Sequence, residues 1–254
     1  MISGQDKRNV HPVVAAIVLA AGKGTRMKSE KAKVLHPVAG RPMILHVVDA
    51  ALGVAGNIVV VVGTQADEVK SIVLSHATVD FALQAEQKGT GHAVLCAMPA
   101  LPENADHVMI LCGDVPLISR ETLAMLVARH TGNGHDITVL AAKVKDPTGY
   151  GRLKQKADGN VACIVEEADA TAAEKAISTI NTGIYIVDRS FLETALMQIN
   201  TNNSQSEMYL TDIVGIAVDS GRRVGLMICR DNREVIGINS PKDLQSVESL
   251  ISSQ

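Results

Sequence analysis

An apolar run from Val13 to Leu19 is followed at once by a turn that contains Gly22 and Gly24. The run is long enough for a buried parallel strand and too short to cross a membrane. Glycines let a backbone pass close to a bulky ligand, and their N–H groups can converge on phosphate oxygens. We therefore predict a loop that binds a nucleotide triphosphate. Basic side chains that could neutralise the phosphates follow at Lys23, Arg26, Lys28, Lys31 and Lys33.

The spacing of this loop excludes two known phosphate-binding patterns. Met27 stands where a dinucleotide-binding fingerprint has its third glycine, and a Walker A loop needs GxxxxGK followed by Ser or Thr. A basic surface turn is the alternative, and it would explain Lys28 and Lys31. It would not explain two glycines and Arg26 directly after a buried strand, so we keep the phosphate-binding interpretation.

Helix and strand patterns alternate through the first half of the chain. Alternation of this kind predicts an α/β fold with a mostly parallel sheet and helices on both faces. Ligands of such sheets bind beyond the carboxyl ends of the strands. After the first strand, we expect helices over 41–52, 68–74 and 90–98 and strands over 57–62, 79–83 and 108–112.

The second half is richer in strands, which predicts an antiparallel or mixed extension of the sheet and a smaller lobe. No repeat, low-complexity linker or change of composition divides the chain, so we expect one domain with two lobes. The expected strands are 137–144, 151–156, 161–165, 183–187 and 224–229, with helices near 191–199 and 210–220 and a closing helix from Pro241.

Composition excludes several function classes. The formal net charge is −3, and the aromatic residues are three tyrosines and two phenylalanines, so nothing attracts nucleic acid or anionic lipid overall and no stacking platform exists for single strands. The cysteines are far apart and form no CxxC pair, which is typical of reduced cysteines. We expect a cytoplasmic protein without a nucleic-acid or membrane partner. The cysteines are Cys96, Cys112, Cys163 and Cys229.

A secretory signal peptide is the alternative interpretation of the N-terminus. Lys7 and Arg8, the apolar run and the small residues from Ala20 to Gly22 imitate one, but cleavage there would destroy the phosphate loop. We therefore prefer a strand followed by a loop, with residues 1–12 as a flexible tail.

Asp114 follows a second apolar strand, in the stretch Cys112–Pro116. A carboxylate at the carboxyl end of an α/β strand lies where the nucleotide binds, and Mg²⁺ on phosphates takes one or two carboxylates plus waters. Capping of the next helix is the alternative role, but Ser119 is better placed for it. We predict that Asp114 is a Mg²⁺ ligand.

The stretch 84–92, QAEQKGTGH, follows a further strand. A glutamine side chain offers a donor and an acceptor and suits the edge of uracil, and Gly89 lets backbone approach a base. An ordinary turn before a helix is the alternative. His36 and His92 lack metal-ligand spacing, and we expect structural roles for both.

Glu166 and Glu167 could be read as a general acid or base. A phosphate monoester nucleophile needs no base, because its second pKa is near ~6 and it is largely dianionic at pH 7. We therefore expect hydrogen bonding to sugar hydroxyls at this stretch, and a solvated strand edge is the alternative for Glu167.

These stretches together resemble the N-acetylglucosamine-1-phosphate uridylyltransferase family, the pyrophosphorylase domain of the bifunctional bacterial enzyme that makes UDP-N-acetylglucosamine. The resemblance covers Val13 to about Asp243, and its motifs are specific in this order and spacing. They are LAAGKGTRM (19–27), KVLHPVAGRPM (33–43), QAEQKGTGHA (84–93), GDVPLIS (113–119), DPTGYGR (146–152), IVEEADA (164–170) and INTGIY (180–185).

The resemblance implies a Rossmann-like nucleotidyltransferase fold with a smaller sugar-binding β lobe. Within a domain of residues 13–254, the nucleotide-binding half would be about 13–135, the sugar-binding half about 136–240 and the closing helix 241–252. The bifunctional family also carries a C-terminal β-helix of hexapeptide repeats, which this chain of 254 residues lacks. We therefore expect neither acetyl transfer nor the family trimer, and either a stand-alone enzyme or a truncated one.

The resemblance also implies roles for individual residues. Arg26 and Lys33 would be catalytic, and Asp114 and Asn239 would hold Mg²⁺. The nucleotide would be bound by Leu19, Ala20, Ala21, Gly22, Lys23, Gly24, Lys33, Gln84, Gly89 and Thr90. The sugar 1-phosphate would be bound by Gly151, Glu166, Asn181, Tyr209 and Thr211.

The implied reaction is attack of the sugar-1-phosphate oxygen on the α-phosphorus of UTP, with pyrophosphate leaving. Both reactants are anions, so the barrier is mainly repulsion and alignment, which Mg²⁺, Arg26 and lysines would relieve. Another sugar 1-phosphate or an alcohol phosphate, with UTP or CTP as the nucleotide, is one alternative. A nucleotide-binding regulatory protein without catalysis is another.

Four residues depart from the family pattern. Ala32 stands where the family usually has Pro, Ala168 where Lys is common, and Ser206 and Met208 where Gly and Tyr are common. Ala168, Ser206 and Met208 fall on the sugar or phosphate side of the site. The identity of the acceptor sugar is therefore the part of the function for which the resemblance gives the least support.

Overall fold

The fold is built on one nine-stranded sheet, seen in a computed structural model that describes residues 12–252. The main path has the order β11-β7-β10-β6-β1-β4-β5, and β8 pairs with β10 and β9. The strands are β1 (Val14–Leu19), β4 (Asn57–Val62), β5 (Asp80–Leu83), β6 (His107–Cys112), β7 (Ile137–Lys143), β8 (Arg152–Gln155), β9 (Val161–Val165), β10 (Thr179–Asp188) and β11 (Val224–Ile228).

The direction of the strands changes between the two halves of the sheet. β1 runs parallel to both β4 and β6, and β4 runs parallel to β5. β10 is antiparallel to β6, β7 and β8, and β8 is antiparallel to β9, whereas β11 returns parallel to β7. The predicted mostly parallel sheet with a mixed extension is confirmed.

Helices cover both faces of the sheet, because apolar side chains of each strand point alternately to two cores. In β1, Val14, Ala16 and Val18 belong to one core, and Ala15 and Ile17 belong to the other. The first core is completed by α1 (Met43–Leu52), α2 (Ala66–Leu74), α4 (Arg120–Asn133) and α8 (Pro241–Ser252). The second is completed by α3 (Thr90–Ala97), α6 (Arg189–Leu196) and α7 (Asp212–Asp219).

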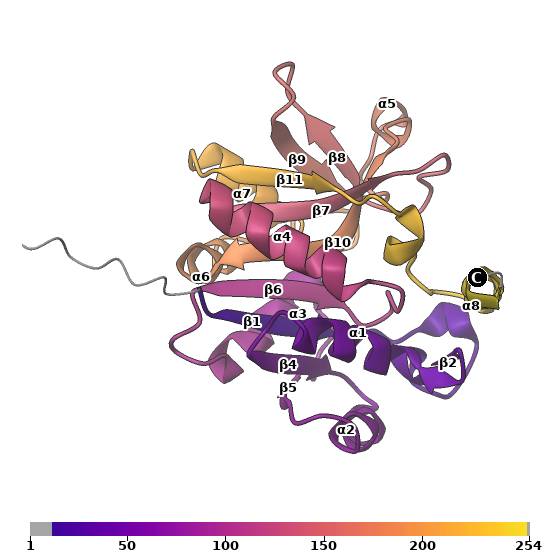
Figure 1. The fold of residues 1–254 in the computed structure, drawn as a ribbon. Coiled ribbons are helices and arrows are strands. Elements are labelled where there is room, and N and C mark those ends of the chain that lie inside the picture. The colour runs from indigo at the N-terminus through magenta and orange to yellow at the C-terminus, as the bar shows by residue number, and fades with distance from the viewer. Residues whose placement is uncertain (1–11, 253–254) are drawn as a thin grey trace, which may run out of the picture.

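Short elements complete the chain. Figure 1 shows the β8–β9 hairpin and α5 (Ala172–Lys175) projecting from the top of the sheet, with α8 beside a small separate hairpin of β2 (Pro37–Val38) and β3 (Arg41–Pro42). Single 3₁₀ turns are η1 (Thr25–Met27), η2 (Lys33–Leu35), η3 (Met98–Ala100) and η4 (Asn232–Val235).

Several predicted elements were wrong at their boundaries; for example, the helix expected near 191–199 spans Arg189–Leu196. Arg41 and Pro42 were expected to begin a helix, but they pair with Val38 and Pro37, and α1 starts at Met43. The strand expected at 183–187 begins at Thr179, because a register shift between Asn181 and Ile184 interrupts the alternating pattern without ending the strand.

Other predictions agree with the structure or fall outside it. Ser119 caps α4, since its hydroxyl accepts a hydrogen bond from the Thr122 amide at 3.1 Å. All four cysteines are free. Residues 1–11 of the predicted flexible tail lie outside the described residues. Within 12–252, none of the helices combines the length and apolarity needed to span a membrane.

A buried histidine ties α4 to the sheet. His130 is 0% exposed, and its Nδ1 lies 3.0 Å from Thr138 Oγ1 on β7. Its Nε2 lies 3.2 Å from Nδ1 of His107 on β6, and the two rings meet edge to face. Burial, reinforced by the neighbouring His107 and His135, lowers the pKa of His130 to about 4. The imidazole is therefore neutral in the folded protein at pH 7.

We predict that the free energy of unfolding falls as the pH drops from about 6.5 toward 4. The unfolded chain protonates His130 near its ordinary pKa of about 6.5, whereas the folded protein does so only near about 4, so acid favours the unfolded state. The loss should reach on the order of 3 kcal/mol. Urea unfolding at pH 7.5 and pH 5 measures the change. The difference in free energy of unfolding between the two pH values should be smaller for His130→Leu than for the wild type.

Candidate active site

A cavity of about 470 Å³ lies at the carboxyl ends of β1, β5 and β6. Every residue predicted from the sequence to bind the nucleotide lines it, and so do the predicted catalytic and metal-binding residues. They are Leu19, Ala20, Ala21, Gly22, Lys23, Gly24, Arg26, Lys33, Gln84, Gly89, Thr90, Asp114 and Asn239. Residues separated by up to 220 positions in the chain thus share one pocket.

The position of the phosphate loop follows from the pairing of β1. Leu19 pairs with Val61 of β4 on one side and Cys112 of β6 on the other. Just past the strand, the Ala20 amide donates to the Val61 carbonyl at 2.9 Å. The Gly113 amide donates to the Leu19 carbonyl, also at 2.9 Å. The loop after β1 and the residues after β6 therefore emerge side by side at one sheet edge.

Gly24 is required by both conformation and space. Its φ of +61° is left-handed, and a Cβ there would lie 2.7 Å from Cβ of Lys33. The chain then forms η1, which exposes Arg26 and buries Met27. A larger residue at position 24 would force the loop away from Lys33.

Four side chains converge on the floor of the cavity. Lys33 Nζ lies 2.5 Å from Asp114 Oδ2 and 3.2 Å from Asn239 Oδ1, and an Arg26 guanidinium nitrogen lies 3.0 Å from the same Asn239 oxygen. The backbone brings the two segments together, since the Ile238 amide donates to the Asp114 carbonyl at 2.9 Å. Only the lysine and the carboxylate of this cluster form an ion pair.

The oxygens of Asp114 and Asn239 fit a divalent cation, because both already lie within hydrogen-bond reach of one cationic atom, Lys33 Nζ. One carboxylate and one amide oxygen suit Mg²⁺, which keeps several waters and takes its remaining ligands from phosphates. No three His, Cys, Asp or Glu side chains gather as a metal site in residues 12–252. The donor set therefore suits a metal carried with phosphates better than one held by protein ligands alone.

The predicted uracil-binding stretch is a rigid loop. Gln84 is 3% exposed, and its Nε2 donates to the Gly89 carbonyl at 2.9 Å and lies 3.2 Å from His92 Nδ1. His92 thus has the structural surroundings expected of it. Because the amide nitrogen of Gln84 already holds the loop, base recognition by this stretch would rest on its other polar atoms.

The stretch 84–92, which we call the uracil loop after its predicted role, is joined to the segment 206–211. The Met208 amide donates to the Lys88 carbonyl at 2.7 Å, and the Gly91 amide donates to the Met208 carbonyl at 2.8 Å. The Leu210 amide donates to Thr90 Oγ1 at 3.1 Å. Ser206, where the family has Gly, keeps a left-handed φ of +54°, so this turn has a glycine-like backbone without a glycine.

The residues predicted to bind the sugar lie together, beside the cavity rather than along its wall. Thr211 Oγ1 donates to Glu166 Oε1 at 2.9 Å, and a Cβ on Gly151 would lie 3.3 Å from Glu166 Oε2. The Asn181 amide donates to the Gly151 carbonyl at 2.8 Å. Burial raises the pKa of Glu166, against the lowering effect of Thr211.

Tyr209, another member of the predicted sugar-binding set, has a hydroxyl that contacts two side chains outside this set. The hydroxyl contacts Asp169 Oδ2 at 3.1 Å and Gln205 Oε1 at 2.9 Å, and the residue is 8% exposed. Its side chain therefore orders the 205–211 segment. Contact with a sugar would involve its ring edge or its backbone.

Two features were missed or misread from the sequence. Gln87 lines the cavity, and its buried Nε2 has no hydrogen-bond partner among the described residues, which marks it as a donor available to a ligand. Glu167, for which a solvated strand edge was the alternative interpretation, is partly exposed, but its carboxylate lies 2.6 Å from the guanidinium of the buried Arg152, an ion pair that the sequence did not predict. The neighbouring DPTGYGR motif contains Arg152 but carries no local signal of burial.

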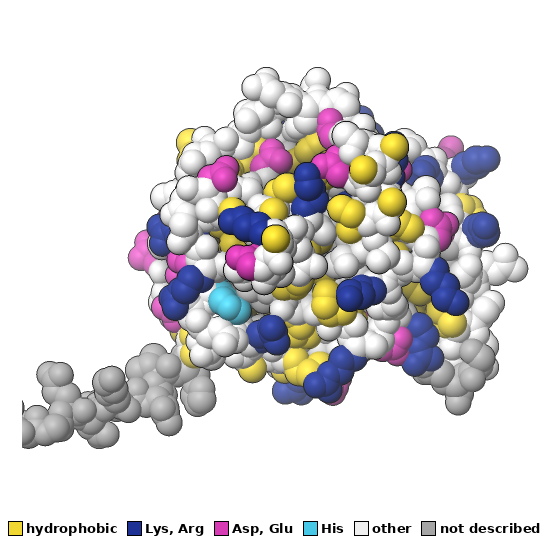
Figure 2. Space-filling model, turned by 90° about the horizontal axis from the view of Figure 1, so that it is seen from above, with side chains coloured by type: hydrophobic (Ala, Val, Ile, Leu, Met, Phe, Trp, Pro, Cys, Tyr) yellow, Lys and Arg dark blue, Asp and Glu magenta, His cyan; other side chains and the backbone are white. Residues whose placement is uncertain are grey.

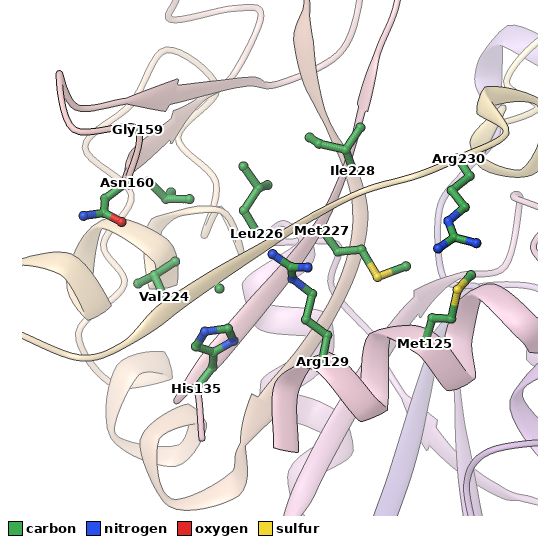
Figure 3. A pocket seen from close by; sticks show the side chains of 12 residues that line it. Met125, Arg129, His135, Gly159, Asn160, Val224, Leu226, Met227, Ile228 and Arg230 are labelled. Atoms are coloured by element: carbon green, nitrogen blue, oxygen red, sulfur yellow. The ribbon is translucent and has the colours of Figure 1, made fainter. Parts of the chain in front are cut away.

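A larger cavity, of about 720 Å³, lies along the edge strand β11 and contains none of the predicted site residues. Figure 3 shows its lining side chains from α4, β11 and the β8–β9 turn, with Arg129 on α4 and Arg230 in the loop after β11. It has no carboxylate, so it lacks the acid–cation cluster found at the carboxyl ends of β1 and β6.

Charged side chains are dispersed on the face of the molecule seen from above. Figure 2 shows lysines and arginines interspersed with acidic side chains there, without one large basic patch. This distribution agrees with the predicted absence of a nucleic-acid partner, which stays a prediction.

Comparisons with known proteins place the chain among nucleotidyltransferases. The MobA-like NTP transferase domain matches residues 16–179. The chain is similar to the bifunctional protein GlmU of Desulfotalea psychrophila, with 47% identity over 91% of this chain and 68% of that protein. It is equally similar to GlmU of Syntrophotalea carbinolica, with 47% identity over 95% of this chain but 52% of that protein. The chain thus spans about half to two thirds of these relatives.

A solved structure shows the same fold. A Bacillus anthracis protein assigned as a glucose-1-phosphate thymidylyltransferase, crystallised with sucrose, superposes with a TM-score of 0.73 at 20% identity. The alignment covers 94% of this chain and 95% of that one. At this identity the likeness extends to the Rossmann-like nucleotidyltransferase fold and no further.

We predict that Gly89→Ala destabilises the protein. Gly89 has φ +108°, and a Cβ there would lie 2.5 Å from the Met208 carbonyl oxygen, so the uracil loop and the 206–211 segment would separate. The expected cost is about 1–3 kcal/mol, measured by urea unfolding. Gly22→Ala is the matched control, since nothing lies within 4 Å of its Cβ position. Equal stability of the two variants would contradict the close packing of Gly89 against the Met208 carbonyl.

Proposed function

The chain belongs to the GlmU family of MobA-like NTP transferases, and from this membership we propose that it forms UDP-N-acetylglucosamine and pyrophosphate from UTP and N-acetylglucosamine 1-phosphate. The enzyme class, sugar-1-phosphate nucleotidyltransferase, is that of the family. The observation that carries the proposal is the single cavity in which the phosphate loop, Asp114 and Asn239 meet. The substrates themselves are inferred.

We assign the triphosphate of UTP to the loop after β1. Lys23 and Arg26 are exposed at this loop and can neutralise phosphate oxygens, while the backbone N–H groups around Gly22 can donate to them. Lys33 lies deeper, at the cluster with Asp114. We assign the uracil to the loop 84–90, where Gln87 has a buried amide nitrogen without a partner.

Asp114 and Asn239 would hold Mg²⁺. When bound, the ion would neutralise part of the phosphate charge. Lys33 would then exchange its contact with Asp114 for the phosphates, because an ammonium on a flexible stem can reorient. Arg26 would contact the departing pyrophosphate. The side chain that it contacts here, Asn239, is neutral and so leaves the positive charge of Arg26 available to the phosphates.

The sugar 1-phosphate would enter beside Gly151, Glu166 and Thr211. Glu166 is an acceptor for sugar hydroxyls and already has a fixed orientation through Thr211. No general base is needed, because the attacking atom is an already ionised phosphate oxygen. Catalysis then consists of holding two anions in line and neutralising their charges.

The predicted division of the chain would hold with two exceptions, because Glu207 and Asn239 of the second half line the nucleotide cavity. Residues 13–135 would bind the nucleotide, residues 136–240 would bind the sugar, and the helix over 241–252 would close the first core. A cytoplasmic location remains part of the proposal, consistent with four free cysteines.

A second candidate acceptor is another sugar 1-phosphate. The motivating observation is that Ala168, Ser206 and Met208 depart from the family on the sugar side. Purified protein should be assayed for Mg²⁺-dependent pyrophosphate release from UTP or CTP with a panel of sugar and alcohol phosphates. Fastest release with UTP and N-acetylglucosamine 1-phosphate supports the proposal. UTP binding without release of pyrophosphate in the presence of any acceptor would favour a regulatory protein.

We predict that Arg26→Ala lowers turnover with UTP by about a hundredfold to a thousandfold, because charge stabilisation of the leaving pyrophosphate is lost. Steady-state pyrophosphate release measures the change. Lys31→Ala is the control, since Lys31 is exposed in the same basic segment but does not line the cavity. Near-normal turnover of the Arg26 variant would remove this residue from the site.

For Asp114→Asn we predict that the Mg²⁺ concentration giving half-maximal activity rises at least about tenfold, because a neutral amide replaces the carboxylate ligand. A Mg²⁺ titration of pyrophosphate release measures it. Asp49→Asn serves as the control, because Asp49 pairs with Arg41 and His76 at the surface of α1. An unchanged Mg²⁺ requirement would falsify the ligand assignment.

A further inference from the structure

Arg152, at the start of β8, is the largest fully buried side chain of the described residues, with 1% of it exposed. A buried guanidinium is costly unless it is paired and its donors are satisfied. The location is also unusual, because β8 belongs to the small hairpin that projects from the sheet rather than to its centre.

The guanidinium of Arg152 joins three segments of the small lobe. It forms an ion pair of 2.6 Å with Glu167 Oε2, just after β9. It donates to the carbonyl of Tyr150, in the loop before β8, and to the carbonyl of Lys175 at 3.4 Å, at the end of α5. All three contacts come from one side chain, so its loss would release all three segments together.

Glu167 makes a second contact with the same loop. The Gly149 amide donates to its Oε2 at 3.3 Å, and Lys175 Nζ lies 3.9 Å from its Oε1. Hydrogen bonding to Arg152 lowers the pKa of the Glu167 carboxyl, so the pair is charged at neutral pH. We call the Arg152–Glu167 pair with its contacts to Tyr150, Gly149 and Lys175 the clasp.

The two charged residues of the clasp are sequence neighbours of two residues that we assign to the sugar site. Arg152 follows Gly151, and Glu167 follows Glu166. The hairpin register pairs Arg152 with Val165, so Gly151 and Glu166 come next to each other where the two strands end. The space above Gly151 is bounded by Glu166 Oε2, 3.3 Å from the position of a Cβ.

We propose that the clasp is a positioning device that fixes the separation of Gly151 and Glu166 and thereby sets the fit of the sugar 1-phosphate. The proposal rests on the proposed function, because it takes Gly151 and Glu166 as walls of the sugar site. Arg152 and Glu167 do not touch the reacting atoms in this assignment. They act through their neighbours, so their loss should affect sugar binding far more than nucleotide binding.

The test is Glu167→Gln, which keeps the size of the side chain and removes its charge. We expect KM for N-acetylglucosamine 1-phosphate to rise about tenfold, the usual effect of losing a hydrogen bond to a charged group, with KM for UTP within about twofold of the wild type. Arg152→Lys should show the same direction, since a lysine cannot reach all three partners at once.

Lys154→Gln is the matched control. Lys154 lies two residues further along β8 and forms an ion pair of 2.7 Å with Glu174, but neither residue contacts Gly151 or Glu166 through that pair. This variant should keep both KM values. A rise in the sugar KM for Lys154→Gln as large as for Glu167→Gln would overturn the proposal, because general loosening of the lobe would then explain both.

Hydrogen exchange of the free protein provides a readout that does not depend on turnover. Glu167→Gln should speed exchange of the amides of residues 148–152 and 166–168, and Lys154→Gln should not. If Glu167→Gln exchanges faster but the wild type transfers no uridylyl group, the clasp still positions Gly151 and Glu166. The assignment of these two residues to a sugar site would then be refuted. Unchanged exchange, or an unchanged sugar KM in a folded and active Glu167→Gln, would overturn the clasp.

Discussion

The rest of the structure depends on the pairing of β1 between β4 and β6. All three strands are parallel, so their carboxyl ends meet at one edge, and side chains of β1 supply both cores of the sheet. The loop after β1 and the Gly113–Asp114 turn after β6 are therefore adjacent before any polar contact forms. A strand buried on both faces is held by apolar packing, which makes it a rigid base for loops that must bind a flexible, highly charged ligand.

On this base, two long-range connections assemble the site. The contact of Ile238 with Asp114 brings the C-terminal segment to the phosphate loop, so that Asn239, Lys33 and Arg26 share the floor of the cavity. The 206–211 segment connects the uracil loop, through Met208, to the sugar side, through Thr211. A single segment thus contacts residues of both proposed substrate sites.

Features that depend on neighbouring residues in the chain could be predicted. The alternation of helix and strand, the phosphate loop, Asp114 at a strand end and Ser119 as the helix cap all follow from local patterns. The strand before Ile184 could not be predicted, because the register shift at Asn181 breaks the alternation. Gln87, Arg152 and Glu167 were missed or misread because burial, unpaired donors and ion pairs depend on partners distant in sequence.

The sequence by itself determined that the chain forms an α/β sheet with a basic, glycine-containing loop after its first buried strand, and its ordered motifs pointed to one family. These conclusions rest on periodicity and on the backbone freedom of glycine, which are local properties. Only the tertiary structure decided that the predicted nucleotide-binding residues share one cavity, that the predicted sugar-binding residues lie outside its lining and that Arg152 is buried against Glu167. The physical reason is that burial and charge pairing depend on distances in space, which are set when the sheet and its two helical layers pack together.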